Sequence, residues 1–479
     1  MSGIRWTTEE VLEALGVDRV TGPGAGDFSG VSTDTRAVLA DSLFVALRGE
    51  RFDGHHFLSQ AAERGATAMV VERIPADAPA GVRYFQVENA THALGKLARF
   101  RRRQLHGRVV GIAGSNGKTT TKDLVLATLS ARFRVHATEA NLNNQVGVPL
   151  TLLRTPDDAE VVVVEMGTNE PGEIPLLTRI VEPDLVVITS IGEEHLEKLG
   201  SLEGVLDEEI TVIDGLRQGG LALIAEEPPA LVERVRAALG AGRVRVVGLG
   251  ADADLRPDGA IEVQPDGSTR WSWQNVAVHL PLPGRHNVRN ALFALGVARE
   301  LGISPADAAR ALEKVPPPKF RGEWKRIGAM RVLVDCYNAN PPSVAAAVDL
   351  LASLAADGPR VAVVGTMREL GSQADALHRR AAEEIAAHFG GGLDRVIATG
   401  DFARAFAALP GGLGERLVVC EDPLEAYAVA ALRGDETLLL KASRGEALER
   451  WLPLLERDFN GPRTSPAASD RQLPPTLAE

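Results

Sequence analysis

Short apolar runs recur along this chain, and helical patterns, many of them rich in alanine, separate them. The runs that we expect to form strands are 108–112, 160–164, 184–189, 331–334, 360–364, 395–398 and 437–440. Strands that are apolar almost throughout are typical of parallel sheets buried on both faces. The alternation therefore predicts an α/β fold in which helices cross over between parallel strands.

Changes in this pattern divide the chain into segments. Its 479 residues are too many for one hydrophobic core, so about three domains are expected. Residues 253–282 alternate polar and apolar positions, which predicts a small antiparallel excursion, and Pro316 to Pro318 predict a stiff linker. We predict a smaller N-terminal α/β domain at 1–105, a central parallel-sheet domain at 106–315, a C-terminal Rossmann-like domain at 316–458 and a disordered tail at 459–479.

The charge and the cysteine content limit the possible partners. A formal net charge of −12 argues against a nucleic-acid partner, which would need Lys and Arg to neutralise its phosphates. Arg99, Arg101, Arg102 and Arg103 form a short basic cluster that indicates a solvated helix face or a domain boundary. Two cysteines are too few for a disulfide framework and fit a reducing compartment. With neither a signal sequence nor a membrane-spanning run, we expect a cytoplasmic protein.

The most informative segment is 108–121, where an apolar strand enters a glycine-rich turn followed by a lysine and three threonines. Backbone N–H groups of such a turn cradle phosphates, Lys118 can reach the terminal phosphates, and the Thr119 hydroxyl can bind magnesium. The spacing departs from the usual motif, because Ile112 stands where its first glycine is expected. A simple glycine turn before a core helix would not explain the lysine and threonines. We therefore predict a P-loop ATPase domain that binds ATP or GTP, with a helix at 122–130.

Polar side chains also follow two strands of the central segment, and ligands bind beyond the carboxyl ends of parallel strands. Glu165 ends an apolar strand, where it could hold magnesium, cap a helix or form a loop salt bridge. His195 follows another strand, as a ligand or as an ordinary packed or surface histidine. Asn141, Asn143 and Asn144 resist both helix and strand, because their amides compete for backbone partners. We interpret them as a hydrogen-bonding shelf for a polar ligand.

Two further groups of polar residues lie later in the chain. Asn287 and Asn290 stand near the start of a helix, where they could contact a base or a phosphate, although capping alone would explain Asn287. In the last segment three strands end in polar, glycine-containing stretches, at 335–341, 364–371 and 441–445. We expect these stretches to form a second ligand-binding face.

Together these motifs resemble the Mur ligase superfamily of ATP-dependent amide-forming enzymes, in the same order and from about Gly30 to Asp458. The family's glycine loop, asparagine element, glutamate, histidine and adenine-side motif are matched by 114–120, 138–149, Glu165, His195 and 286–290. The branch that adds D-alanyl-D-alanine is matched by 335–341, 369–371 and 441–445. The D-N-P-R signature of the branch that adds diaminopimelate or lysine does not occur in the sequence.

The resemblance implies ATP and Mg²⁺ as cofactors and a role for each matching residue. The implied catalytic residues are Lys118, Glu165, His195 and Glu209. The implied nucleotide contacts are Gly114, Ser115, Asn116, Gly117, Lys118, Thr119, Thr120, Asn287, Asn290, Arg321, Asp335 and Asn338. The implied magnesium ligands are Thr119 and Glu165 for one ion and His195 and Glu209 for the other. The implied substrate contacts are Ser32, Asp34, Arg36 and Arg48 for the uridine diphosphate, Asn141, Asn143 and Asn144 for polar groups, and Glu369, Ser443 and Arg444 for the dipeptide.

One departure from the family pattern concerns its carbamylated lysine, which follows the histidine and bridges to the second magnesium. The corresponding stretch, 201–211, contains no lysine, and Glu209 or Glu208 occupies the place. A carbamate turns a lysine into an anion, so a glutamate can supply the same charge with a shorter reach. We hypothesise that Glu209 does so without carbon dioxide; otherwise the second metal is held differently or activity is impaired.

The resemblance implies an enzyme that joins D-alanyl-D-alanine to UDP-N-acetylmuramoyl-tripeptide through an acyl phosphate, in peptidoglycan precursor synthesis. It also implies domains that close on their ligands, and we expect a monomer without membrane insertion. Three alternatives stay open. They are a sister ligase of the folylpolyglutamate or Mur type with another amino acid, a P-loop kinase or nucleotide switch, and a catalytically weak homologue used for binding.

Overall fold

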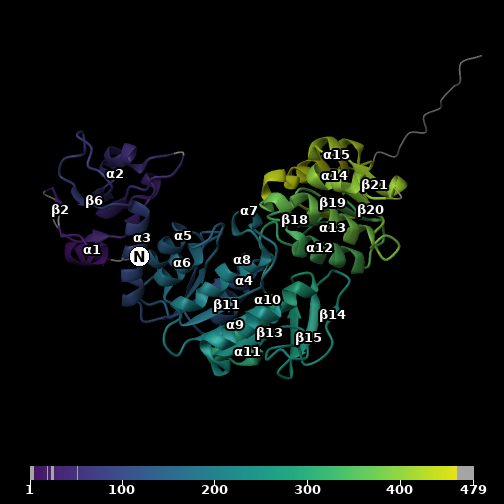
Figure 1. Cartoon of the computed structure of the whole chain (residues 1–479), viewed down its shortest axis with the longest axis horizontal. Coiled ribbons are helices and arrows are strands. Elements are labelled where there is room, and N and C mark those ends of the chain that lie inside the picture. Colours follow the sequence, from purple (N-terminus) through teal and green to yellow (C-terminus); the bar gives the residue numbers. More distant parts are fainter. Residues whose placement is uncertain (1–4, 19, 23–25, 51, 411, 461–479) are drawn as a thin grey trace, which may run out of the picture.

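The computed structural model describes residues 5–18, 20–22, 26–50, 52–410 and 412–460. Three α/β bodies follow one another along the chain, from the purple N-terminal body through the teal central body to the green and yellow C-terminal body (Figure 1). The α/β class and the parallel sheets predicted from the sequence are confirmed. The tail predicted from residue 459 lies, from residue 461 onward, outside the described residues, and the domain boundaries stay predictions.

The N-terminal body is built on a sheet with the order β2-β7-β6-β5-β4, in which only β2 is antiparallel to its neighbour. A two-stranded antiparallel pair, β1 with β3, lies beside it. The strands are β1 (Arg5–Trp6), β2 (Val20–Thr21), β3 (Phe28–Ser29), β4 (Val31–Ser32), β5 (Ser42–Val45), β6 (Ala66–Val71) and β7 (Arg83–Gln86). The helices are α1 (Thr8–Leu15), α2 (Leu58–Glu63) and α3 (Ala90–Gln104).

The central body holds a six-stranded, wholly parallel sheet with the order β13-β12-β11-β8-β10-β9. Its strands are β8 (Arg108–Ala113), β9 (Val135–Ala137), β10 (Val161–Glu165), β11 (Leu185–Ile188), β12 (Leu221–Ala225) and β13 (Val244–Val247). Its helices are α4 (Lys118–Ser130), α5 (Gly147–Leu153), α6 (Glu173–Val181), α7 (Leu196–Leu199), α8 (Leu202–Ile210), α9 (Pro229–Leu239), α10 (Arg285–Glu300) and α11 (Pro305–Leu312). The excursion predicted at 253–282 is an antiparallel sheet of β14 (Glu262–Val263), β15 (Thr269–Trp273) and β16 (Val276–Leu280).

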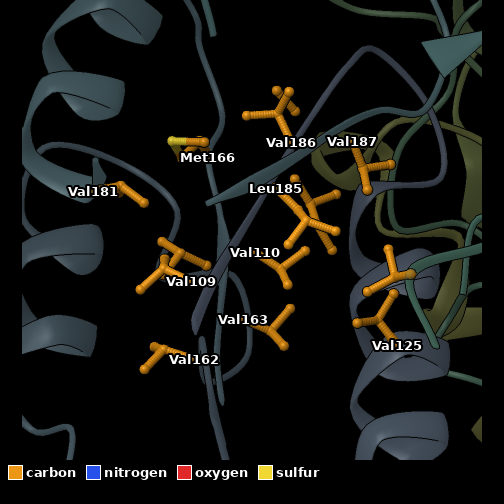
Figure 2. Packing of buried hydrophobic residues seen from close by; sticks show 14 of the residues in the cluster. Val109, Val110, Val125, Val162, Val163, Met166, Val181, Leu185, Val186 and Val187 are labelled. Atoms are coloured by element: carbon orange, nitrogen blue, oxygen red, sulfur yellow. The ribbon is translucent and has the colours of Figure 1, made fainter. Parts of the chain in front are cut away.

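The packing of the central body explains why its strands could be recognised from the sequence. Valines of β8, β10 and β11 fill both faces of the sheet, as the labelled side chains of Figure 2 show, and they are completely or almost completely buried. A strand with apolar residues on both faces reads as a continuous apolar run. The helix predicted at 122–130 begins four residues earlier, at Lys118, because Gly117 ends the loop in a left-handed conformation (φ 85°) and serves as its N-cap.

The C-terminal body holds a second six-stranded sheet with the order β17-β18-β22-β19-β20-β21, and only β17 is antiparallel. Its strands are β17 (Glu323–Ile327), β18 (Met330–Asp335), β19 (Arg360–Val364), β20 (Arg395–Ala398), β21 (Leu417–Val419) and β22 (Thr437–Lys441). Its helices are α12 (Pro341–Ser353), α13 (Ala374–Ala386), α14 (Gly400–Ala407), α15 (Pro423–Val429) and α16 (Trp451–Phe459). Pro316 to Pro318 have no regular secondary structure and precede β17.

The arginine cluster of α3 is not a uniformly solvated face, because two of its members are buried between the first two bodies. Arg102 is 1% exposed and donates to the carbonyls of Val181 and Glu182. Arg101 donates to the carbonyl of Thr155. The helix packs against α5 and α6 of the central body, beside which it lies in Figure 1. The cluster was interpreted as a solvated helix face or as a domain boundary, and the burial of Arg101 and Arg102 agrees with the domain boundary.

The helix α7 joins the central body to the C-terminal body. Leu196 and Leu199 are buried in the same hydrophobic cluster as Leu333 and Val364 of the C-terminal sheet. Figure 1 places the label of α7 beside β18.

Within the described part of the chain, no helix is both long and apolar enough to cross a membrane. Cys336 and Cys420 are both free thiols.

Candidate functional site

The residues that follow β11 fix the shape of the glycine-rich loop between β8 and α4. Gly114 has φ 113°, and a Cβ there would lie 2.5 Å from the Thr189 hydroxyl. The Asn116 amide donates to the Ser190 hydroxyl at 2.8 Å, and the Ser115 hydroxyl accepts from the Gly192 amide at 2.9 Å. These contacts with the residues after β11 give the loop a fixed shape, which a phosphate-binding turn needs.

Two residues predicted to bind the first metal meet at the carboxyl ends of the parallel strands. The Thr119 hydroxyl, in the first turn of α4, donates to Oε1 of Glu165 at 3.1 Å. Asn143 donates to the same oxygen at 2.9 Å. The other carboxylate oxygen, Oε2, is buried and has no hydrogen-bond partner among the described residues. A buried oxygen without a donor is a group that a cation would satisfy.

The two glutamates that competed for the place of the family lysine have different surroundings. Glu209 is fully buried, and its Oε2 accepts from the Gly114 amide of the loop at 2.7 Å. Its Oε1 has no partner among the described residues. Glu208 instead accepts from the amides of Gly172 and Ile174 at 2.8 Å each, at the N-terminus of α6. Glu209 therefore faces the phosphate loop, and Glu208 caps a neighbouring helix.

The charged groups around Lys118 shift its pKa and the pKa of Glu209. Burial opposes the charged form of this lysine, but Glu194, Glu209 and Glu165 outweigh burial and raise its pKa. Burial is also the main reason that the pKa of Glu209 is raised to about 7; Lys118 lowers it and Glu194 raises it further. The ammonium of Lys118 donates to the carbonyls of Gly114 and Ser115 and lies 3.5 Å from Oε1 of Glu194. A single lysine thus lies among three buried carboxylates.

His195 contacts the C-terminal body. It caps α7 with a left-handed backbone (φ 52°), and its Nδ1 lies 2.5 Å from Oε2 of Glu369. The amide of Glu197 donates to the carbonyl of Glu369 at 3.0 Å. Burial lowers the pKa of His195, but the hydrogen bond to Glu369 and the charges of Glu194 and Glu369 together outweigh burial and raise the pKa. Glu369, which was expected at the dipeptide, therefore lies against the predicted metal-binding histidine.

Three further contacts bring the C-terminal body to the phosphate loop region. Asn340 donates to Oδ1 of Asn116 at 2.9 Å. Arg380 of α13 forms an ion pair with Glu193 at 2.6 Å. Gln373 donates to the carbonyl of Gly200 at 2.9 Å. The second ligand-binding face predicted for the C-terminal strands is thus turned toward the loop.

The other predicted residues of the C-terminal body form a polar cluster at the ends of β18 and β22. Asp335 pairs with buried Lys441 at 2.9 Å, and Lys441 also donates to the carbonyl of Asn338. The Ser443 hydroxyl lies 3.4 Å from Oδ1 of Asn338. Arg444 pairs with Glu449, and the Arg321 guanidinium lies 3.9 Å from the centre of the Tyr337 ring. Arg321 also acts on the charge of Lys118.

The predicted uridine-side residues lie apart from the phosphate loop, on the N-terminal body. Ser32 ends β4, and its hydroxyl interacts with the backbone of Asp34. Asp34 forms a two-point ion pair with Arg36, which lowers the pKa of the carboxyl to about 2. Arg48 is exposed after β5. The four residues share the carboxyl edge of two parallel strands, as a ligand site in an open sheet requires.

The asparagines divide between structural and site positions. Asn143 contacts Glu165, whereas Asn144 accepts from the amides of Val146 and Gly147 and so shapes the turn before α5. Asn141 is exposed.

Asn290 lies against the phosphate loop, since a Cβ on Gly117 would come within 2.5 Å of its Oδ1. Asn287 is not the helix cap, because that position is Gly284; it donates to the Pro283 carbonyl and accepts from Asn290 instead.

Sequence reasoning missed Glu194. This residue is 5% exposed and lies between Lys118 and His195. The available signal was a second glutamate directly before His195 at the end of an apolar strand. In the family pattern around the histidine, G-E-x-H-L, Glu194 stands at the variable position x, so the pattern does not single it out.

No group of three or more His, Cys, Asp and Glu side chains that could hold a metal ion occurs among the described residues. Magnesium usually binds through one or two carboxylates together with water and substrate phosphates. The unpartnered oxygens of Glu165 and Glu209 at the phosphate loop therefore fit a magnesium–nucleotide site better than a cage built from protein alone.

The fold and site define a P-loop nucleotide-binding protein whose loop is flanked by a second α/β sheet. Family models agree along the chain. The Mur ligase family catalytic domain matches residues 27–102, the Mur ligase middle domain 112–298, and the Mur ligase glutamate ligase domain 321–444. The UDP-N-acetylmuramoyl-tripeptide–D-alanyl-D-alanine ligase of Bacillus subtilis is 36% identical over 88% of this chain and 91% of its own. The chain belongs to the Mur ligase family.

Solved structures agree with this assignment. The structure of MurF from Acinetobacter baumannii matches 96% of this chain and 100% of its own, with a TM-score of 0.86 and 29% identity. MurF ligase from Thermotoga maritima in complex with ADP matches 90% of this chain and 97% of its own, with a TM-score of 0.77 and 27% identity. The three-body arrangement described above is therefore the fold of these ligases.

Proposed function

We propose that this protein is an ATP-dependent ligase that joins D-alanyl-D-alanine to UDP-N-acetylmuramoyl-tripeptide, a step of peptidoglycan precursor synthesis in the cytoplasm. The observation that carries the proposal is the meeting of two sheets at one phosphate loop. Lys118, Thr119 and Glu165 stand on one side, and Asn340 and Glu369 reach the loop region from the other. A ligase needs such a junction, because its nucleotide and its amine arrive on different domains.

The chemistry requires two anions to approach each other. The terminal carboxylate of the tripeptide attacks the γ-phosphorus of ATP, which forms an acyl phosphate and releases ADP. The amine of D-alanyl-D-alanine then attacks the acyl carbon, the C–O bond to phosphate breaks, and inorganic phosphate leaves as the amide forms. Lys118 would turn from the carbonyls of Gly114 and Ser115 to the phosphates and would neutralise part of their charge.

Magnesium would neutralise the remaining phosphate charge and orient the transferred phosphoryl group. Thr119 and Glu165 would hold one ion. His195 and Glu209 would hold another, with Glu209 in the role that the family gives to a carbamylated lysine. Both glutamates offer a buried oxygen that has no partner in the part of the chain that the structure describes, as this role requires.

The other predicted residues divide between substrates by body. Ser32, Asp34, Arg36 and Arg48 would hold the uridine diphosphate. The remaining nucleotide contacts would come from loop residues 114–120 and from Asn287, Asn290, Arg321, Asp335 and Asn338. Ser443, Arg444, Asn141 and Asn143 would contact the peptide substrates, and Asn144, also expected there, would act through the turn that it shapes. The chain would act as a monomer.

A sister ligase with another amine is the second candidate, since the folylpolyglutamate synthase of Mycobacterium tuberculosis shares the fold, with a TM-score of 0.59 and 19% identity. The test is phosphate release from ATP and magnesium with UDP-N-acetylmuramoyl-tripeptide, with and without D-alanyl-D-alanine. Release that requires both supports the proposal, and Lys118→Ala should abolish it. Release stimulated only by another amine would favour the sister ligase, and release without an amine would favour a kinase or a nucleotide switch.

A further inference from the structure

Glu194 is a buried acid for which the proposed mechanism has no role. It follows β11 directly before His195, and only 5% of it is exposed. Its Oε1 lies 3.5 Å from the Lys118 ammonium, and its Oε2 lies 3.9 Å from Nε2 of His195. Burying a carboxylate is costly unless a partner compensates, so the position calls for one.

Lys118 alone is a poor partner for this carboxylate. A separation of 3.5 Å is long for a charge-assisted hydrogen bond, which is usually 2.7–2.9 Å. The ammonium already donates to the carbonyls of Gly114 and Ser115. When Lys118 turns to a phosphate, Glu194 loses its nearest cation. Another cation must then compensate it.

The charges of the pocket also call for further cations. Glu165, Glu194 and Glu209 surround one lysine, with Arg321 as a more distant positive charge. Oε2 of Glu165 and Oε1 of Glu209 are buried and have no partner among the described residues. A nucleotide adds further negative charge to this set. Divalent cations are the groups that relieve such crowding in phosphoryl-transfer sites.

The contact between Glu194 and His195 is suited to a shared ion. Neighbouring ligands of an octahedral magnesium ion, each at about 2.1 Å, are about 3.0 Å apart. Oε2 of Glu194 and Nε2 of His195 are 3.9 Å apart, so the two side chains would have to approach by about 1 Å to share the ion. Nδ1 of His195 faces Glu369, which leaves Nε2 as the nitrogen directed toward Glu194.

We propose that Glu194 is a ligand of the divalent cation at His195, next to Glu209, and that it forms this bond when a nucleotide withdraws Lys118. The inference rests on the proposed nucleotide site and adds a residue to it. The nucleotide phosphates would supply the remaining ligands of this ion, since the described side chains alone form no metal-binding group of three.

Binding of Mn²⁺ to the full-length protein with ADP, followed by electron paramagnetic resonance, tests the proposal. Glu194→Gln keeps the size of the side chain and removes its charge, and it should weaken one Mn²⁺ site about tenfold or more. Glu197→Gln is the matched control, because Glu197 is exposed and lies three residues further along the chain. It should leave both Mn²⁺ sites unchanged. Circular dichroism verifies that the variants fold.

An unchanged or tighter Mn²⁺ affinity in folded Glu194→Gln would overturn the proposal. If the variant also bound ADP more tightly without metal, Glu194 would be only the counterion of Lys118. Failure of the proposed function has a different signature. In that case the wild-type protein would release no phosphate with the two substrates, while its Mn²⁺ titration would still differ from that of Glu194→Gln.

Discussion

At the scale of single residues, two neighbouring glutamates of α8 have separate tasks. Glu208 accepts from two amides at the start of α6, whereas Glu209 places beside the phosphate loop an oxygen without a partner among residues 5–18, 20–22, 26–50, 52–410 and 412–460. A capping carboxylate stabilises the fold, and an uncompensated buried carboxylate costs stability that a bound cation can restore. The two substitutions should therefore have opposite effects.

Glu208→Ala should lower the free energy of unfolding by about 1–3 kcal/mol, because the buried amide of Ile174 and the partly exposed amide of Gly172 lose a charged acceptor. Glu209→Ala should leave stability equal or higher and should raise the magnesium concentration needed for half-maximal phosphate release at least tenfold. Thermal unfolding and a magnesium titration measure the two effects. Glu203→Gln, on the exposed side of the same helix, is the control. Unchanged activity and magnesium dependence in Glu209→Ala would exclude a metal role for Glu209.

At the scale of elements, α3 attaches the N-terminal body to the central one through buried arginines. Arg102 donates to the C-terminal carbonyls of α6 and to Asp184, which in turn accepts from the amide of Val109 in β8. Its neighbour Arg103 makes an exposed pair with Glu182. Residues one position apart on a helix point in different directions, so Arg102 is buried while Arg103, with the same side chain, is exposed.

Arg102→Ala should destabilise the protein by about 3–5 kcal/mol, since it leaves buried carbonyls and Asp184 without their donor. Arg103→Ala should cost less than about 1 kcal/mol. Urea denaturation followed by intrinsic fluorescence compares the two variants. Similar losses of stability in the two variants would mean that the burial of Arg102 does not strengthen the attachment of α3 to the central body.

The elements also explain which parts of the structure the sequence could predict. The runs around Val110, Val163 and Val187 were legible because both faces of these strands are buried. β12, with the sequence of Leu221–Ala225, was not predicted, since its mixture of leucine and alanine suits a helix equally well. β17 was missed because it is an antiparallel edge strand with charged residues. Its sequence lacks an apolar run.

The site was predictable only where its residues belong to one motif. The loop, Glu165 and His195 lie at strand ends that a parallel sheet brings together. Contacts such as those of Glu369 with His195 and of Asn340 with Asn116 join residues more than 170 positions apart. They depend on how two bodies pack, which local patterns do not encode. Glu194 needed the same information, since its burial appears only once the loop is folded.

At the scale of the whole molecule, a few polar contacts and α7 connect the loop to the C-terminal body. The pairs of Glu369 with His195 and of Arg380 with Glu193 have one member each that is about half exposed. Such pairs are worth about 0–1 kcal/mol each, so they bias the arrangement of the bodies without locking it. These polar contacts, unlike the buried leucines of α7, can break and re-form at small cost when the bodies move.

The double variant Glu369→Ala with Arg380→Ala should shift the ligand-free protein toward more open arrangements, by about tenfold in population for about 1.4 kcal/mol. Small-angle X-ray scattering should then report a larger radius of gyration than for the wild type. Arg379→Ala, at an exposed neighbouring position of α13, should leave the radius unchanged. Identical scattering from all three proteins would mean that the buried leucines of α7 alone set the arrangement.

The leucines of α7 have a practical consequence for anyone who wishes to produce the C-terminal body separately. A fragment that begins at residue 316 would lack Leu196 and Leu199, which fill its hydrophobic cluster. Losing a buried leucine side chain usually costs about 2–5 kcal/mol, and the uncovered surface would favour aggregation. Adding residues 195–200 as a separate peptide should improve the solubility of such a fragment, because this peptide supplies the two leucines that cover the hydrophobic cluster.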